Sequence, residues 1–207
     1  MSVGARIFAA MYDHLMAGTE KAGLRDERAR LVAGAKGDVL EIGAGTGANL
    51  AHYPDDIGTL TLTEPEPAMV KRLQKRLDEL GRPAMVLRAP AEDLPFADDS
   101  FDTVVCTLTL CTVDDQPRAL RELRRVLRPG GRLLFLEHVR ATDDGSARWQ
   151  DRLNGVQQVI AGGCNCNRPT GDALAPAGFI VRSIENGTLP KAPPWIRPTV
   201  YGVAEAG

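Results

Sequence analysis

The sequence lacks several features that would place it in other classes of protein. It has no run of eighteen apolar residues, so no membrane-spanning helix is expected. Its formal net charge of −2 gives no general basic bias toward nucleic acid. The short apolar patch at the N-terminus is interrupted by Arg6 and Asp13 and makes a poor signal peptide. We therefore expect a cytoplasmic protein whose partners are neither membranes nor nucleic acids.

Cysteine is also scarce, with four residues in 207. Cys164 and Cys166 are separated by a single residue and lack both the two-residue spacer and the second pair that are typical of a zinc site. We expect all four cysteines to be reduced packing residues, and we predict no metal site. The sequence has no internal repeat, and no feature of it indicates a particular oligomeric state.

Strand and helix patterns alternate along the chain. Apolar runs predict strands at 39–42, 59–63, 84–88, 101–107, 132–137, 179–184 and 199–204, and other patterns predict helices at 5–17, 20–34, 67–80, 116–127, 143–162 and 170–177. This alternation is typical of an α/β fold with a mostly parallel sheet and helices on both faces. We predict a single domain over residues 1–207, a Rossmann-like seven-stranded sheet with a lid-like insertion at about 138–170.

Residues 37–47 carry the strongest sign of a ligand site. An apolar strand ends in Glu41, and glycines follow at positions 43, 45 and 47. Glycine permits positive φ and close approach of the backbone to a ligand, and open α/β sheets bind ligands at the carboxyl ends of their strands. The pattern fits a dinucleotide or S-adenosylmethionine (SAM). The acid before the first glycine favours SAM, whose ammonium group would pair with it.

Glu64 ends the second predicted strand. A carboxylate there can accept both hydroxyl groups of a ribose, which suits SAM and a dinucleotide equally. Later motifs distinguish the two: Ala89-Pro-Ala-Glu-Asp-Leu-Pro-Phe96, Asp98-Asp-Ser-Phe-Asp102 and Val126-Leu-Arg-Pro-Gly-Gly131. In their order and spacing, residues 37–137 resemble the class I SAM-dependent methyltransferases, methyltransferase type 11. The resemblance implies SAM as the methyl donor and S-adenosylhomocysteine as the product.

The same resemblance implies where the cofactor binds. Glu41, Gly43, Gly45 and Gly47 would line its methionine end, Glu64 would hold the ribose, and Ala91 and Glu92 would frame the adenine. Many members carry an acid where this chain has Pro90, so Glu92 or Asp93 is the candidate for the adenine amino group. The further predicted contacts are Tyr12 on the first helix, Ala44, Asn49, Pro65, Thr107 and Leu108.

Flanking segments show a closer resemblance, to the methyltransferase-like 7 group, whose animal members are membrane-anchored thiol S-methyltransferases. These segments are Glu64-Pro-Glu-Pro67, Glu137-His-Val139, Gly163-Cys-Asn165 and Arg197-Pro-Thr-Val-Tyr-Gly202. Pro90 is normal in that group. The chain lacks the hydrophobic N-terminal anchor of the animal proteins, so we expect it to be soluble.

His138 follows the fifth predicted strand, at the edge where a methyl acceptor should lie. It is the candidate catalytic residue, a base for a thiol or phenol, and the alternative is a structural histidine beneath the lid. Trp149, Trp195 and Ile160 are candidates for an apolar acceptor pocket or for plain packing. We predict SAM-dependent methyl transfer to a small-molecule acceptor, with a thiol sulfur first. The alternatives are O- or N-methylation of a small metabolite and a non-catalytic SAM- or NAD-binding module.

Overall fold

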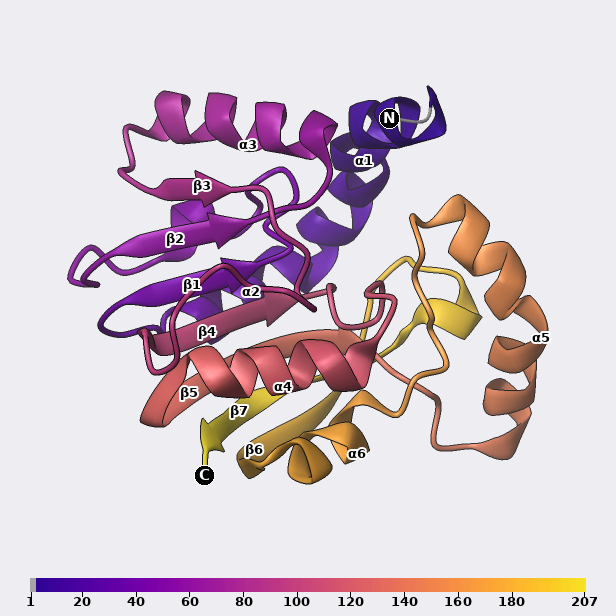
Figure 1. Ribbon diagram of the computed structural model, residues 1–207. Helices are drawn as coiled ribbons and strands as arrows, with labels where there is room; N and C mark the ends of the chain where they lie inside the picture. Colours follow the sequence, from indigo (N-terminus) through magenta and orange to yellow (C-terminus); the bar gives the residue numbers. More distant parts are fainter. Residues whose placement is uncertain (1–2) are drawn as a thin grey trace.

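The computed structural model describes residues 3–207, with side chains from residue 11 onward. Figure 1 shows a twisted sheet with helices on both sides of it. The described chain forms a seven-stranded sheet in the order β3-β2-β1-β4-β5-β7-β6. The strands are β1 (Val39–Ile42), β2 (Leu60–Thr63), β3 (Met85–Leu87), β4 (Phe101–Thr107), β5 (Leu127–His138), β6 (Phe179–Thr188) and β7 (Pro198–Ala206). The predicted fold class is confirmed.

Strands β1 to β5 pair in parallel, whereas β7 pairs antiparallel with β5 and β6 pairs antiparallel with β7. The strand order reverses between β1 and β4, because β2 and β3 lie on one side of β1 while β4 and β5 lie on the other. In open α/β sheets this switch point forms a crevice at the carboxyl ends of the strands. The topology therefore opens the ligand crevice beside the Gly-rich turn.

The helices are α1 (Val3–Thr19), α2 (Arg25–Val32), α3 (Pro67–Leu80), α4 (Gln116–Val126), α5 (Asp144–Ile160) and the short α6 (Thr170–Leu174). Apart from α5, they cover the sheet on both faces (Figure 1). Because side chains alternate along a strand, Val104 and Phe135 pack with α4, whereas Val105 and Leu134 pack on the opposite face with α2 and α3. Each face thus has its own buried apolar core.

Most element boundaries follow local signals. The predicted limits of β1, α3 and β4 are confirmed. The predicted helix over 20–34 is instead a π-helical turn, Glu20–Leu24, followed by α2, because Gly23 adopts a φ of 139° and kinks the chain. Strand β6 extends to Thr188, four residues beyond the prediction, because it pairs with β7 along its whole length.

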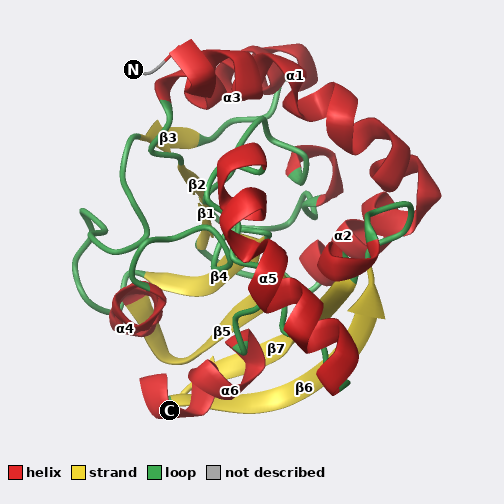
Figure 2. Cartoon of the chain, turned by 90° about the vertical axis from the view of Figure 1, so that its right-hand side faces the viewer, coloured by secondary structure: helices red, strands yellow, loops and turns green. Residues whose placement is uncertain are grey.

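Helix α5 stands beside the carboxyl edge of the sheet, within the predicted insertion (Figures 1 and 2). Gln150 on this helix is fully buried, and its amide donates to the carbonyl oxygens of Val139, Cys166 and Trp195. One side chain therefore joins α5 to three separate segments. Across the described residues, none of the helices combines the length and the apolar character needed to cross a membrane.

Candidate active site

A cavity of about 810 Å³ lies along the carboxyl ends of the strands. The predicted site residues on its wall are Tyr12, Gly43, Gly45, Glu64, Pro65, Ala91, Glu92, Leu108 and His138. The order of these residues along the crevice follows the order of the strands: Ala91 after β3, Glu64 after β2, Gly43 after β1, Leu108 after β4, and His138 at the end of β5. With neighbouring strands about 4.8 Å apart, this wall spans roughly 19 Å.

The other predicted cofactor residues do not line the cavity. They are Glu41, Ala44, Gly47, Asn49, Asp93 and Thr107. Asp93 is exposed, whereas the Glu92 carboxylate accepts hydrogen bonds from the backbone N–H groups of Asp114 and Asp115, at 2.8 and 3.2 Å. Of the two candidates for the adenine amino group, Glu92 alone reaches the cavity.

The Gly-rich turn uses its glycines for different reasons. Gly43 has a φ of 58°, and a Cβ atom there would lie 2.4 Å from the side chain of Thr109. Gly45 has a φ of 56°, but a Cβ atom there would meet only the Gly43 carbonyl oxygen, at 3.9 Å. Gly43 is therefore required by packing, whereas Gly45 leaves open space at the cavity.

Glu64 is bound to this turn. Its Oε2 accepts the N–H of Gly45 and its Oε1 accepts the N–H of Glu66, both at 2.9 Å. Burial raises the pKa of Glu64 above its ordinary value. Because each carboxylate oxygen has two lone pairs, Glu64 can accept further hydrogen bonds from a ligand in the cavity.

Glu41 lies beneath the turn and is 2% exposed. Its carboxylate accepts hydrogen bonds from the Tyr53 hydroxyl at 2.7 Å and the Asn49 amide at 2.9 Å. Desolvation raises the pKa of Glu41 to about 7, against the lowering effect of these bonds and of nearby Arg28. The sequence suggested that a cationic ligand would pair with Glu41. In the structure, side chains of the protein itself interact with this carboxylate.

Arg28, on α2, is a buried cation that the sequence did not reveal. Its guanidinium is 3% exposed and donates to Asn49 Oδ1, Thr107 Oγ1 and Glu20 Oε1 at 3.2, 2.7 and 3.0 Å. The segment around it is strongly polar, so no apolar periodicity marks Arg28 as buried. Arg28 therefore fixes Asn49 and Thr107 behind the cavity wall.

The loop after β4 is held by Glu137, another buried acid without an assigned role in the sequence. Glu137 is completely buried, and its carboxylate accepts the backbone N–H groups of Thr109, Leu110 and Cys111 at 2.9 to 3.1 Å. Leu108, at the start of this loop, has a φ of 56°, which is unusual for leucine. Such strained residues persist where the surroundings impose them, and Leu108 faces the cavity.

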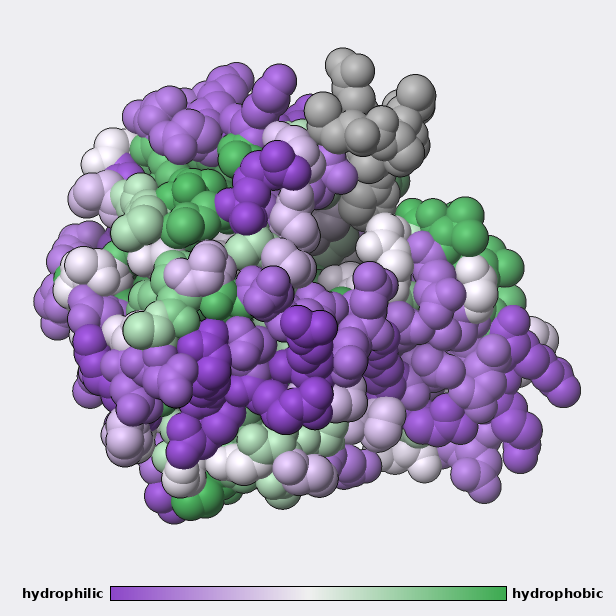
Figure 3. Space-filling model, viewed as in Figure 1, coloured by the Kyte–Doolittle hydropathy of each residue, from purple (hydrophilic) through white to green (hydrophobic). Residues whose placement is uncertain are grey.

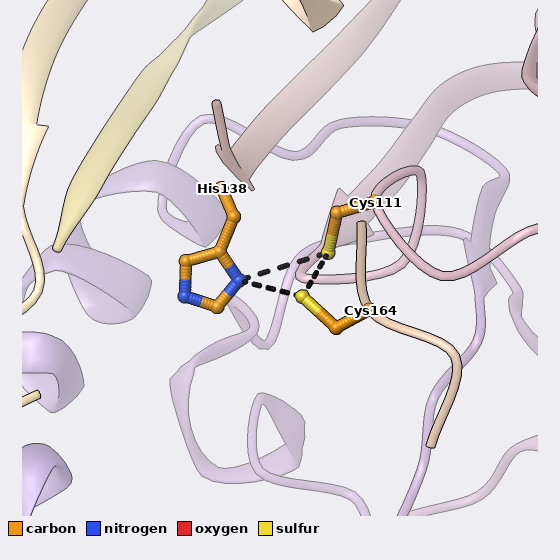
Figure 4. Close-up of side chains that lie close together, drawn as sticks. All are labelled: Cys111, His138 and Cys164. Carbon is orange, nitrogen blue, oxygen red and sulfur yellow. Dashed lines mark hydrogen bonds between the residues drawn. The ribbon is translucent and has the colours of Figure 1, made fainter. Parts of the chain in front are cut away.

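Cys111, His138 and Cys164 meet at the far end of the cavity (Figure 4). The His138 Nδ1 atom lies 3.7 Å from the Cys111 Sγ and 3.5 Å from the Cys164 Sγ, and the two sulfurs are 3.8 Å apart. Hydrogen bonding to Cys111 and His138 lowers the pKa of Cys164 to about 5, while the same cluster and burial raise the pKa of Cys111. Within the described residues, the His138 Nε2 atom is buried and has no hydrogen-bond partner.

Cys164 and Cys166 are close together in the sequence, but in the structure Cys164 contacts Cys111 rather than Cys166. Cys164 lies beside Cys111, 53 positions away along the chain. Cys166 is fully buried, with its sulfur 3.9 Å from Asn154 Oδ1. The Cys106 thiol donates a hydrogen bond to the Glu137 carboxylate. The cysteines thus divide into two that face the cavity and two that do not.

Apolar residues of α5 and of the turn before β7 line the same end of the cavity. Ile160, one of the candidates for an acceptor pocket, lines it together with Val159 and Ile196. Trp149 lies outside the cavity, 58% exposed, and Trp195 packs against the cysteine cluster. Figure 3 shows a hydrophobic surface over the upper end of α5, where the exposed apolar residues Val156, Val159 and Ile160 lie.

Comparisons with known proteins agree with this geometry. The family described as "Methyltransferase domain" matches residues 40–135. Human thiol S-methyltransferase TMT1A is 35% identical over 201 residues, which cover 95% of this chain and 82% of the human protein. Human TMT1B is 43% identical over 156 residues, covering 72% of this chain and 63% of that protein. A SAM-dependent methyltransferase structure from Thermotoga maritima, titled a possible histamine N-methyltransferase, has a TM-score of 0.72 at 22% identity, covering 98% and 97% of the two chains.

The sheet topology and the Gly-rich crevice, together with these matches, define a class I SAM-dependent methyltransferase. Within that class, the chain belongs to the methyltransferase-like 7 family, the family of thiol S-methyltransferase TMT1A. The family resemblance inferred from the sequence is confirmed.

Proposed function

We propose that this enzyme transfers the methyl group of SAM to the sulfur of a small thiol, giving a methyl thioether and S-adenosylhomocysteine. The observation that carries the proposal is the 35% identity with TMT1A across 95% of the chain. The cavity volume of about 810 Å³ suits a small-molecule site. The net charge of −2 gives no attraction for a nucleic-acid substrate.

The residues on the cavity wall fit SAM in the order of the strands. Open space at Gly45 admits close approach of a ligand to the backbone, and Glu64 beside it retains lone pairs for ribose hydroxyls. Ala91 and Glu92 would frame the adenine next to Glu64. SAM supplies a methyl group on a positively charged sulfur, and in this arrangement that end of the cofactor would point toward Leu108 and His138, on the far side of the Gly-rich turn in the strand order.

The acceptor would lie between the β4 loop and α5. Val159, Ile160 and Ile196 give this end of the cavity an apolar lining that suits the carbon skeleton of a small thiol. Methyl transfer mainly requires that the sulfur nucleophile be held close to the methyl carbon and in line with its leaving sulfur. The α5 insertion would act as the specificity element because it supplies most of this lining.

The test is a turnover assay with acceptors that share one carbon skeleton and differ only in the nucleophile: benzyl mercaptan, benzyl alcohol and benzylamine. We expect S-adenosylhomocysteine to form with the thiol alone, with methyl benzyl sulfide as the second product by mass spectrometry. Faster turnover of the alcohol or amine would favour O- or N-methylation. No thiol turnover despite measured SAM binding would overturn the assignment.

A matched pair of variants shows that the turnover belongs to this chain. Glu64→Ala should lose turnover at low SAM concentration, because Glu64 lies on the wall of the cavity. Glu79→Gln, on the exposed side of α3, should retain the wild-type rate. Equal rates for both variants would trace the activity to a contaminant or to a site other than this cavity.

A further inference from the structure

The cluster of Cys111, His138 and Cys164 has the geometry of a metal site. Its three ligand atoms come from separate parts of the fold: the loop after β4, the end of β5 and the segment after α5. All three side chains are buried, and the ligand atoms lie within 4.8 Å of one another (Figure 4). Within the part of the chain that the structure describes, this is the single group of three or more His, Cys, Asp or Glu side chains placed to hold a metal ion.

The distances fit a tetrahedral zinc ion. Zinc–sulfur bonds of about 2.3 Å and zinc–nitrogen bonds of about 2.05 Å place two tetrahedral sulfurs about 3.8 Å apart and a sulfur and a nitrogen about 3.6 Å apart. The observed separations are 3.8 Å between the sulfurs and 3.7 and 3.5 Å from them to the His138 Nδ1 atom. A disulfide would require the two sulfurs to approach to about 2.05 Å.

The backbone holds the two cysteines together independently of their sulfurs. The N–H of Asn165, next to Cys164, donates to the Cys111 carbonyl oxygen at 2.7 Å. The N–H of Cys111 in turn donates to the buried Glu137 carboxylate, adjacent in the chain to His138. These bonds fix all three ligand-bearing segments, so the site is formed in advance of any ion.

Three protein ligands leave one position of a tetrahedral zinc ion for another group. Because Cys111, His138 and Cys164 all line the cavity, that position opens toward the place where the acceptor would lie. Two thiolates and an imidazole are a ligand set that selects zinc over hard cations such as magnesium. Two thiolates also balance the charge of the ion, which suits a buried site.

We propose that Cys111, His138 and Cys164 bind a zinc ion that takes the acceptor thiol as its fourth ligand; this rests on the proposed function. The acceptor thiol displaces water from the ion and releases its proton to solvent, so that its sulfur binds as a thiolate. That sulfur then forms a bond to the SAM methyl carbon while the methyl–sulfonium bond breaks. The bonding pair stays on the sulfur of S-adenosylhomocysteine. The neutral thioether leaves, and water returns.

The first test is metal content of the full chain, purified with a reductant and without added chelator. We expect about one zinc ion per chain, and zinc affinity in Cys111→Ser and Cys164→Ser reduced by more than the roughly 10–100-fold that loss of an outer partner costs. Cys166→Ser, which alters a buried cysteine outside the cluster, should bind zinc as the wild type does. Failure of the wild type to take up zinc or cobalt under reducing conditions overturns the proposal, including the case in which Cys111 and Cys164 are found as a disulfide.

The second test uses cobalt in the unaltered chain, so it does not depend on a variant that folds. Cobalt(II) should show the visible and near-ultraviolet bands of tetrahedral thiolate coordination. Benzyl mercaptan should change these bands in the absence of SAM, whereas benzyl alcohol should not. Cobalt bands that do not change when benzyl mercaptan is added would overturn the role of the ion in holding the acceptor.

The two proposals fail separately. Thiol methylation that survives complete metal removal, with unchanged kcat/KM in Cys164→Ser, would leave the proposed function standing and overturn the metal site. Metal binding and a thiol-sensitive cobalt spectrum without any methylation of thiols would support the metal site and overturn the proposed function.

Discussion

The backbone N–H of Cys111 donates a 3.1 Å hydrogen bond to the carboxylate of Glu137, 26 positions further along the chain. The same carboxylate accepts the N–H groups of Thr109 and Leu110. A single side chain on β5 thus determines the course of the loop after β4. That loop carries both Leu108, at the centre of the cavity wall, and Cys111, at its far end.

Glu137→Gln should therefore destabilise the protein. The variant keeps the shape of the side chain but turns an NH₂ group toward backbone N–H donors, so buried donors lose their acceptor. We expect the free energy of unfolding to fall by about 2–4 kcal/mol, measured by urea denaturation of the cofactor-free protein. Glu79→Gln, on the exposed side of α3, is the control and should match the wild type. Equal stability of the two variants would contradict the role given to Glu137.

Glu41 should make stability depend on pH. Its pKa is raised by burial from an ordinary 4.5 to about 7 in the folded protein. An acid of this kind holds its proton more tightly when folded, so its contribution to stability is present at low pH and is lost as the pH rises from about 4.5 through about 7. The loss is about 3 kcal/mol, on the scale of about 1.4 kcal/mol for each pH unit between the two values.

Glu41→Gln removes this titration without removing the side chain. Urea denaturation of wild type and variant at a series of pH values should show the variant gaining stability relative to the wild type between about pH 4.5 and 7, by up to about 3 kcal/mol. Comparison of the two proteins cancels the other titrating groups. A difference that stays constant over this range would show that Glu41 does not titrate there.

Local chemistry explains what the sequence could predict. Helix α3 begins at Pro67 and is ended by Gly81, which has a φ of 61°. Local residues therefore determine both limits of that helix. Glu64 and the Gly-rich turn were found for a similar reason: each follows directly on a short apolar strand, and parallel strands bring such ends to one edge.

Contacts between distant segments explain what the sequence could not predict. Arg28 meets Thr107 across 79 positions, and Cys111 meets Cys164 across 53. Neither pairing leaves a local pattern in the sequence, because the two partners in each case come from different elements of the fold. Spacing along the chain instead suggests a pair of Cys164 with Cys166, which does not line the cavity. The antiparallel return of β7 between β5 and β6 is likewise a matter of topology.

Two glycines of the turn should respond differently to the same substitution. Both have positive φ, so Gly43→Ala and Gly45→Ala should each cost about 1–2 kcal/mol of stability through backbone strain. Gly43→Ala should cost more, because its Cβ atom would lie 2.4 Å from Thr109. Gly45→Ala should instead weaken SAM binding, because its methyl group enters open space at the cavity.

Urea denaturation and calorimetric titration with SAM separate these two effects. Equal losses of stability in the two variants would contradict the packing role of Gly43. An unchanged SAM affinity in Gly45→Ala would place the cofactor away from the turn.

Glu64 should supply the main polar contact to the ribose. Removing two charge-assisted hydrogen bonds, each worth about 1.5–3 kcal/mol, should make Glu64→Ala bind SAM at least about tenfold more weakly. The SAM affinity of Glu64→Gln should lie between those of Glu64→Ala and the wild type, since glutamine keeps one acceptor oxygen. Because Glu64 also binds the N–H groups of Gly45 and Glu66, a loss of affinity alone would not distinguish a ribose contact from a disturbed turn.

A cycle with a modified ligand makes that distinction. S-adenosylhomocysteine and its 2′-deoxy analogue should differ in affinity for the wild type by the strength of one ribose hydrogen bond. They should bind Glu64→Ala almost equally, because the acceptor is gone. If the deoxy analogue loses the same affinity in both proteins, the hydroxyl binds elsewhere, and Glu64 acts only by holding the Gly-rich turn in place.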